Sequence, residues 1–132
     1  MQNLEPENQD LGVKPQIQFI SGQEEMAVPR RIRLTRSENG KTGTATFIFF
    51  KPMVFSFFLT VLSPDVVLIK GMDLLWDKQK ITSKDIRIYF KEGKPVVLRS
   101  ILIFRNSKDW FNFLNFMSCY SKETGLSFTE FK

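Results

Sequence analysis

The chain has 132 residues, enough for one domain with a real hydrophobic core, and its composition is ordinary except for 14 phenylalanines. With no histidine and one cysteine, the chain lacks the residues for imidazole metal ligands, Cys–His nucleophile pairs, zinc knuckles and internal disulfides. We therefore expect a protein that is not an enzyme and that binds neither a metal ion nor a cofactor. The net charge is +5, and because residues 1–25 are acidic, the remainder is more basic still and suits acidic partners, anionic lipid or RNA.

The N-terminal residues 1–15 are polar, contain proline and show no periodicity, so we predict a disordered tail. They include no apolar segment and resemble neither a signal peptide nor a transit peptide, so we expect the protein to act where it is made. Residues 16–132 are predicted to form a single domain. Its first strand covers residues 16–20, where apolar and polar side chains alternate.

The most informative segment is a β-hairpin at residues 30–50. Its first strand alternates Arg31 and Arg33 with aliphatic residues, which puts guanidinium groups on one side and the core on the other. The returning strand covers 44–50 and places Phe47 and Phe49 together on one face, predicted to be the core. The loop between the strands contains Asn-Gly and a second glycine, which accept positive φ and close a hairpin of moderate length.

An apolar stretch follows at residues 53–62, bounded by a Lys-Pro pair before it and by Ser-Pro-Asp after it. A membrane span needs about twenty apolar residues, so a transmembrane helix is the weakest interpretation. A buried strand is favoured, and an exposed hydrophobic docking patch is the alternative.

Three further strands are predicted, over residues 66–76 with a bulge near Gly71, over 81–90 and over 96–104, with a tight turn at 91–95. No helical pattern lies between these strands, which indicates an antiparallel meander. We therefore predict an α+β, β-rich fold of about six strands, arranged as a sandwich or part-rolled barrel. One C-terminal amphipathic helix should pack on the sheet.

That helix is predicted to begin at Ser107, whose hydroxyl can cap the first amides, with Asp109 suited to the positive end of the dipole. Gly125 should end it in the left-handed conformation. The apolar residues recur at three- and four-residue spacing and share one face, and they are Trp110, Phe113, Leu114, Met117 and Tyr120. Phe111 and Phe116 flank this face, and we predict that both widen the buried surface, with a partner contact as the alternative.

Four groups of residues resemble motifs of one family. Arg33-Leu-Thr-Arg-Ser, Asn39-Gly and Thr42-Gly-Thr-Ala-Thr-Phe are similar to the signature hairpin of the Psb28 family of small extrinsic photosystem II reaction-centre proteins, also called W proteins. The other similar motifs are Gly71-Met72 before Leu74, Phe90 before Gly93-Lys-Pro, and Trp110-x-x-Phe-x-x-Phe-Met-x-x-Tyr before Gly125-Leu. They occur in the family's order and cover residues 17–128.

The resemblance implies a non-catalytic accessory factor for photosystem II assembly or repair. It implies peripheral attachment to the thylakoid membrane on the cytoplasmic side in a cyanobacterium or the stromal side in a plastid. The implied partners are the chlorophyll-binding inner antenna, the reaction-centre proteins and the region of the b-type cytochrome, with no nucleic acid.

Two function classes fit the hairpin. In the first, an Arg-bearing sheet face or an open sheet edge binds an extended segment of another protein. The predicted docking residues are Arg31, Arg33, Arg36, Thr44 and Thr46, with Gly40 and Gly43 setting the hairpin geometry. In the second, these arginines and Lys41 bind the phosphates of single-stranded RNA while exposed aromatic rings stack on bases. A phosphate-binding loop at Gly40-Lys41-Thr42 is not supported, because the upstream glycine is missing and a strand follows instead of a helix.

Overall fold

The computed structural model describes residues 13–56 and 69–126. Eight strands in these residues form two antiparallel four-stranded sheets, so the predicted α+β, β-rich class is confirmed. The first sheet has the order β2-β1-β5-β6, with β1 (Val13–Ile20), β2 (Gln23–Glu24), β5 (Met72–Asp77) and β6 (Gln79–Ser83). The second has the order β3-β4-β8-β7, with β3 (Arg31–Arg36), β4 (Gly43–Phe50), β7 (Asp85–Lys91) and β8 (Lys94–Phe104).

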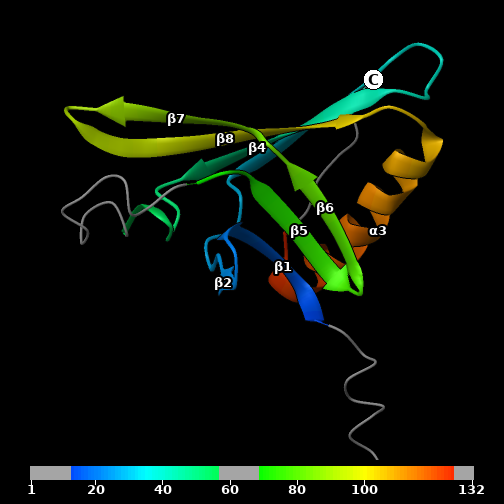
Figure 1. The fold of residues 1–132 in the computed structure, drawn as a ribbon. Coiled ribbons are helices and arrows are strands. Elements are labelled where there is room, and N and C mark those ends of the chain that lie inside the picture. Colours follow the sequence, from blue (N-terminus) through cyan, green and yellow to red (C-terminus); the bar gives the residue numbers. More distant parts are fainter. Residues whose placement is uncertain (1–12, 57–68, 127–132) are drawn as a thin grey trace, which may run out of the picture.

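The helix α3 (Ser107–Thr124) and the first sheet lie on the same side of the second sheet (Figure 1). We call that side of the second sheet its inner face and the opposite side its outer face. β1 begins at Val13, ahead of the predicted domain boundary at residue 16, while residues 1–12 lie outside the described part of the chain.

Aromatic rings fill the space between the inner face and α3. Phe47 and Phe49 are completely buried, which confirms the face predicted for them. Phe47 meets Phe113 of α3 edge to face, with ring centroids 6.0 Å apart, and Phe104 meets Trp110 at 5.1 Å. Such edge-to-face contacts add specific geometry to the burial of large apolar area, so these rings fix the position of α3.

The prediction of one continuous strand over residues 81–90 is wrong, because the chain leaves the first sheet and enters the second within this range. β6 ends at Ser83 and β7 begins at Asp85, on different sheets. The buried Ser83 hydroxyl donates to the carbonyl of Ile101 and accepts from the Ser100 hydroxyl at 3.3 Å. These bonds join β6 to β8 and so tie the edge of the first sheet to the second.

Gly71 lies just before β5, not at a bulge within a strand. A Cβ atom at this position would stand 2.6 Å from the carbonyl oxygen of Ser83, which is closer than real Cβ contacts allow. Gly71 is therefore required by close backbone approach. The first part of the predicted strand, residues 66–68, lies outside the described residues.

The helix cap differs from the prediction by one residue. Asn106, not Ser107, is the N-cap, and its side chain accepts a hydrogen bond from the Asp109 amide at 2.9 Å. Asp109 in turn accepts from the Arg105 amide at 3.1 Å, so the two side chains satisfy amides on both sides of the helix start. The predicted C-cap is confirmed, because Gly125 has φ 79 and donates to the carbonyl of Ser121.

The two phenylalanines beside the helix stripe behave differently. Phe116 is completely buried and meets Trp76 of β5 at 5.5 Å between ring centroids, as predicted. Phe111 is 61% exposed, so the prediction that it widens the buried face is wrong.

The described start of the Phe-rich stretch, residues 53–56, is a turn that enters a helical conformation, so the favoured buried strand is wrong for these residues. Glu25, itself buried, accepts hydrogen bonds from the amides of Met53 at 2.6 Å and Val54 at 2.9 Å. Residues 57–62 lie outside the described residues. Within the described ranges, no helix combines the length and the apolar character needed to cross a membrane.

Candidate docking face

Four of the five predicted docking residues lie on the outer face of the second sheet. The register pairs Arg31 with Ile48, Arg33 with Thr46, and Thr35 with Thr44, so alternate residues of β3 and β4 share this side. Both arginines and Thr35 are exposed, and Thr44 and Thr46 are half-buried. The Thr35 and Thr44 hydroxyl oxygens are 2.6 Å apart, which joins the two strands across this face.

β8 and β7 continue the same face across the sheet. Ile101 lies opposite Thr46 on one side and Asp85 on the other, and Arg99 lies opposite Ile48 and Arg87 in the same way. The outer face therefore consists of Arg31, Arg33, Thr35, Thr44, Thr46, Ile48, Asp85, Arg87, Arg99, Ile101 and Ile103.

The outer face combines four guanidinium groups, one carboxylate and a strip of isoleucines. Ile103 is 51% exposed, which is unusual for so large an aliphatic side chain. In the described part of the chain, the Nε of Arg99 is buried without a hydrogen-bond partner, and its guanidinium carbon lies 5.6 Å from the centre of the Tyr89 ring. An apolar strip edged by guanidinium groups is suited to a partner that carries both apolar side chains and carboxylates.

Sequence analysis did not assign Arg87 and Arg99 to the site. The alternation of residues 85–88 already placed Arg87 away from the core, and that signal could have included it. Arg99 could not have been found in this way, because its position beside Arg87 depends on the pairing of β7 with β8.

Arg36 lies apart from the other predicted docking residues. It is in phase with Ile32 and Leu34 at every second position, so it belongs to the inner side of β3. Its guanidinium group donates to the carbonyl of Gly40 and lies 4.5 Å from the centre of the Trp110 ring. Arg36 thus connects the hairpin loop to α3 by a cation–π contact and a hydrogen bond.

Gly40 and Gly43 of the hairpin are each required to be glycine, for two different steric reasons. Gly40 has φ 70, a conformation that costs little only for glycine and a few polar residues. Gly43 has an ordinary φ, but a Cβ atom there would overlap the carbonyl oxygen of Thr35 on the neighbouring strand. The loop therefore needs glycine at both positions for its shape.

The edges of the second sheet are β3 and β7. Within the described residues, neither strand pairs with a further strand on its outer side. Unpaired backbone amides and carbonyls at such an edge can receive an extended segment of another chain.

Aromatic rings lie at one end of the outer face, where Tyr89 is beside Arg99, and not beside Arg31 and Arg33. Phe50 is 46% exposed and Tyr89 is 44% exposed, and both lie opposite Val97 at the end where β4 finishes. Beside Arg31 and Arg33 the face offers threonine and isoleucine, which do not stack on bases. This distribution favours a protein partner over single-stranded RNA. Among the described residues, no three His, Cys, Asp or Glu side chains are grouped to hold a metal ion.

The resemblance seen in the motifs is confirmed by comparison with known proteins. The family model described as Psb28 protein matches residues 17–128. The chain is 40% identical over 114 residues to the photosystem II reaction center Psb28 protein of Guillardia theta, covering 86% of this chain and 94% of that protein. It is 36% identical over 116 residues to the protein of the same name from Prochlorococcus marinus (strain MIT 9215), covering 88% and 93%.

A plant relative extends the match. The chloroplastic photosystem II reaction center PSB28 protein of Arabidopsis thaliana is 36% identical over 127 residues, which cover 96% of this chain and 66% of that protein. A family model matching most of the chain, together with relatives at this identity, leaves no ambiguity of family. The chain belongs to the Psb28 protein family.

Proposed function

We propose that the chain is a non-catalytic accessory factor of photosystem II that docks through the outer face of its second sheet. The relatives are named photosystem II reaction center proteins, which supports the choice of partner. The observation that carries the docking surface is the set of four guanidinium groups around an isoleucine strip, on a sheet face that no described element covers.

The chemistry of this face suits an extended, acidic protein segment. Carboxylates of the partner would pair with Arg31, Arg33 and Arg87, and guanidinium groups bind carboxylates in a defined two-pronged geometry. Apolar partner side chains would cover Ile101 and Ile103. One unpaired edge, at β3 or at β7, would add backbone hydrogen bonds to the segment.

Membership of this family also supports a proposal for the place of action. We propose peripheral attachment at the thylakoid membrane, on its cytoplasmic or stromal side, during assembly or repair of photosystem II. The partners would be core subunits, among them the inner antenna, the reaction-centre proteins and the region of the b-type cytochrome. The chloroplastic name of the plant relative supports a plastid or cyanobacterial setting.

The test is capture of photosystem II from gently solubilised thylakoids by tagged protein. Wild type should retain photosystem II subunits, and Arg31→Glu/Arg33→Glu should lose them, because two attractive contacts become repulsive. The matched control is Lys108→Glu/Lys122→Glu, which makes the same charge change at two exposed residues of α3. Circular dichroism and thermal unfolding establish that all three proteins are folded.

Three outcomes separate the parts of this proposal. Capture by wild type and control but not by the arginine variant supports both the function and the face. Capture by all three keeps the photosystem role and removes the chosen face. If none of the folded proteins captures photosystem II, while wild type retains RNA, the function is wrong and the RNA alternative replaces it.

A further inference from the structure

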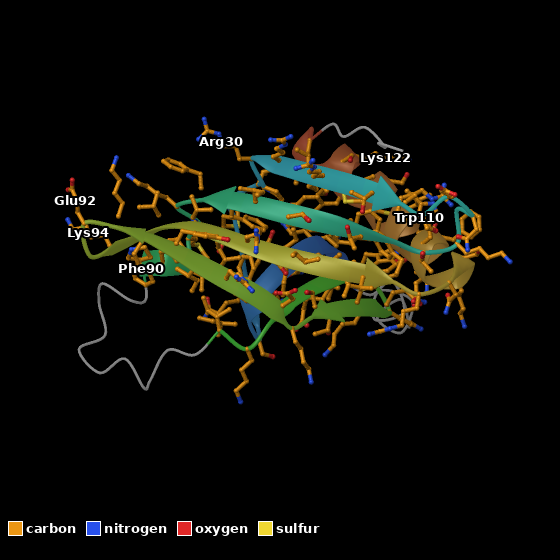
Figure 2. The ribbon with its side chains drawn as sticks, turned by 90° about the horizontal axis from the view of Figure 1, so that it is seen from above. Arg30, Phe90, Glu92, Lys94, Trp110 and Lys122 are labelled. Carbon is orange, nitrogen blue, oxygen red and sulfur yellow. The ribbon has the colours of Figure 1, made fainter. Side chains whose placement is uncertain are left out.

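A second surface lies at one end of the molecule, where β4 finishes and the turn between β7 and β8 projects. Figure 2 shows Phe90, Glu92 and Lys94 at this end, with Trp110 and Lys122 at the other. We call this surface the hairpin end, and its residues are Arg30, Phe50, Lys51, Phe90, Lys91, Glu92 and Lys94. It adjoins the outer face at Phe50 and includes none of the four arginines of that face.

The turn places two ammonium groups side by side. Glu92 has φ 53 and Gly93 has φ 79, so this is a two-residue turn with both central residues in the left-handed region. Lys91 is paired with Lys94 across it, and both are exposed. The tight turn therefore carries a pair of flexible, positively charged side chains at its tip.

Exposed aromatic rings accompany these charges. Phe90 is 62% exposed and Phe50 is 46% exposed. The Arg30 guanidinium carbon lies 5.2 Å from the centre of the Phe50 ring, and the Lys51 ammonium nitrogen lies 5.4 Å from it. Grouped apolar surface of this kind marks interaction sites, and at Phe50 it stands directly beside two cations.

A groove of about 640 Å³ lies between this turn and residues 52–56. Its lining includes the apolar side chains of Met53, Phe55 and Val96, together with Pro52 and Pro95. Three lysines, Lys51, Lys91 and Lys94, contribute to the same lining, with Glu92 as its one carboxylate. The groove therefore combines apolar walls with a positively charged rim.

We propose that the hairpin end binds the headgroup region of an anionic lipid surface. Two features select lipid as the occupant: four cationic side chains against one carboxylate complement negative headgroups, and the exposed rings match the boundary between headgroups and acyl chains. The apolar groove provides room for the upper part of an acyl chain, and lysines of its rim meet the phosphate. This contact goes beyond docking on photosystem II, because it needs no protein partner and uses different residues.

The test is sedimentation of the full chain with vesicles. The vesicles contain phosphatidylcholine alone or phosphatidylcholine mixed with anionic phosphatidylglycerol. Wild type should bind only the anionic vesicles, and raised salt should weaken binding. Lys91→Glu/Lys94→Glu should weaken binding about 20-fold or more, since each basic residue near an anionic surface contributes roughly fivefold.

Two further variants make the result specific. Phe90→Ala should weaken binding to anionic vesicles without changing its salt dependence, because it removes a ring and no charge. Lys108→Glu/Lys122→Glu carries the same charge change as the lysine variant but on α3, away from the hairpin end, and it should bind like wild type.

Several results would overturn the proposal. One is equal binding to both kinds of vesicle, and another is unchanged binding by folded Lys91→Glu/Lys94→Glu. If Arg31→Glu/Arg33→Glu alone abolishes vesicle binding, the outer face is the lipid site instead. If the lysine variant binds vesicles normally but no longer captures photosystem II, the hairpin end recognises protein and not lipid.

Discussion

Neighbouring residues of β4 face opposite environments. Phe47 and Phe49 are completely buried on the inner face, while Thr46 and Ile48 on the outer face keep part of their surface accessible. The inner face is closed by α3 and the first sheet, and the outer face meets no described element. Because side chains alternate along a strand, stability and partner binding are assigned to separate residues of the same segment. Substitutions on the two faces should therefore have separable effects.

The largest effect is expected from an inner-face ring. Phe47→Ala should lower the free energy of unfolding by about 3–5 kcal/mol, because it empties the space between Phe49 and Phe113. The matched outer-face change at the adjacent residue, Thr46→Ala, should cost at most about 1 kcal/mol. Denaturant unfolding monitored by tryptophan fluorescence measures both. Similar losses for the two variants would contradict the division between the faces.

A smaller effect is expected at the polar link between the sheets. Ser83→Ala should cost about 1–3 kcal/mol, because the carbonyl of Ile101 loses a donor and the buried Ser100 hydroxyl loses its acceptor. Adding Ser100→Ala should cost little more, since it removes the hydroxyl that was left unsatisfied. A double-mutant cycle in urea tests this. Strict additivity of the two losses would show that the hydroxyls do not act as a pair.

Tyr120, buried on α3, should make the stability of the folded protein depend on pH in the alkaline range. Burial, followed by the carboxylates of Glu25 and Glu24, raises the pKa of Tyr120 above its ordinary value of 10.0. Above pH 10 the unfolded chain releases this proton while the folded protein retains it, so stability falls by up to about 1.4 kcal/mol per pH unit. Below that pH the contribution is fully present.

Tyr120→Phe should remove that part of the alkaline loss. Urea unfolding at a series of pH values above 9 gives the difference in slope between wild type and variant. Thr46→Ala on the outer face should keep the wild-type slope. An unchanged slope in Tyr120→Phe would mean that other groups cause the alkaline loss.

The predictable parts of this fold are those determined by local pattern. The alternation around Phe47 placed its ring in the core, the Asn-Gly loop closed the hairpin, and Gly125 ended the helix. Each depends on residues within a few positions along the chain. Even the misplaced helix cap was off by only one residue, since Asn106 and Ser107 can both accept from a helix amide.

The unpredictable parts depend on contacts between distant residues. The switch from β6 to β7 brings Ser83 against Ile101. The phase of the apolar residues shifts between Ile81 and Ile86, but that shift alone does not reveal that the chain changes sheets. Alternation along β3 already places Arg36 on the side of Ile32 and Leu34, opposite Arg31 and Arg33, but its contact with Trp110 of α3 depends on packing between distant segments. In the same way, Arg99 joins the predicted docking residues only through the pairing of β8 with β4 and β7.

The smallest effect on the free energy of unfolding is expected for the exposed outer-face arginines, in contrast to the buried Phe47 of the inner face. Arg31→Ala/Arg33→Ala should change the free energy of unfolding by no more than about 0.5 kcal/mol, because both side chains are exposed. The same variant should capture less photosystem II than wild type, though more than Arg31→Glu/Arg33→Glu, because it removes attraction without adding repulsion. Thermal unfolding and thylakoid capture on the same preparations measure both properties. A large loss of stability would mean that the arginines support the sheet itself, whereas full stability with full capture would place the docking contact elsewhere on the protein.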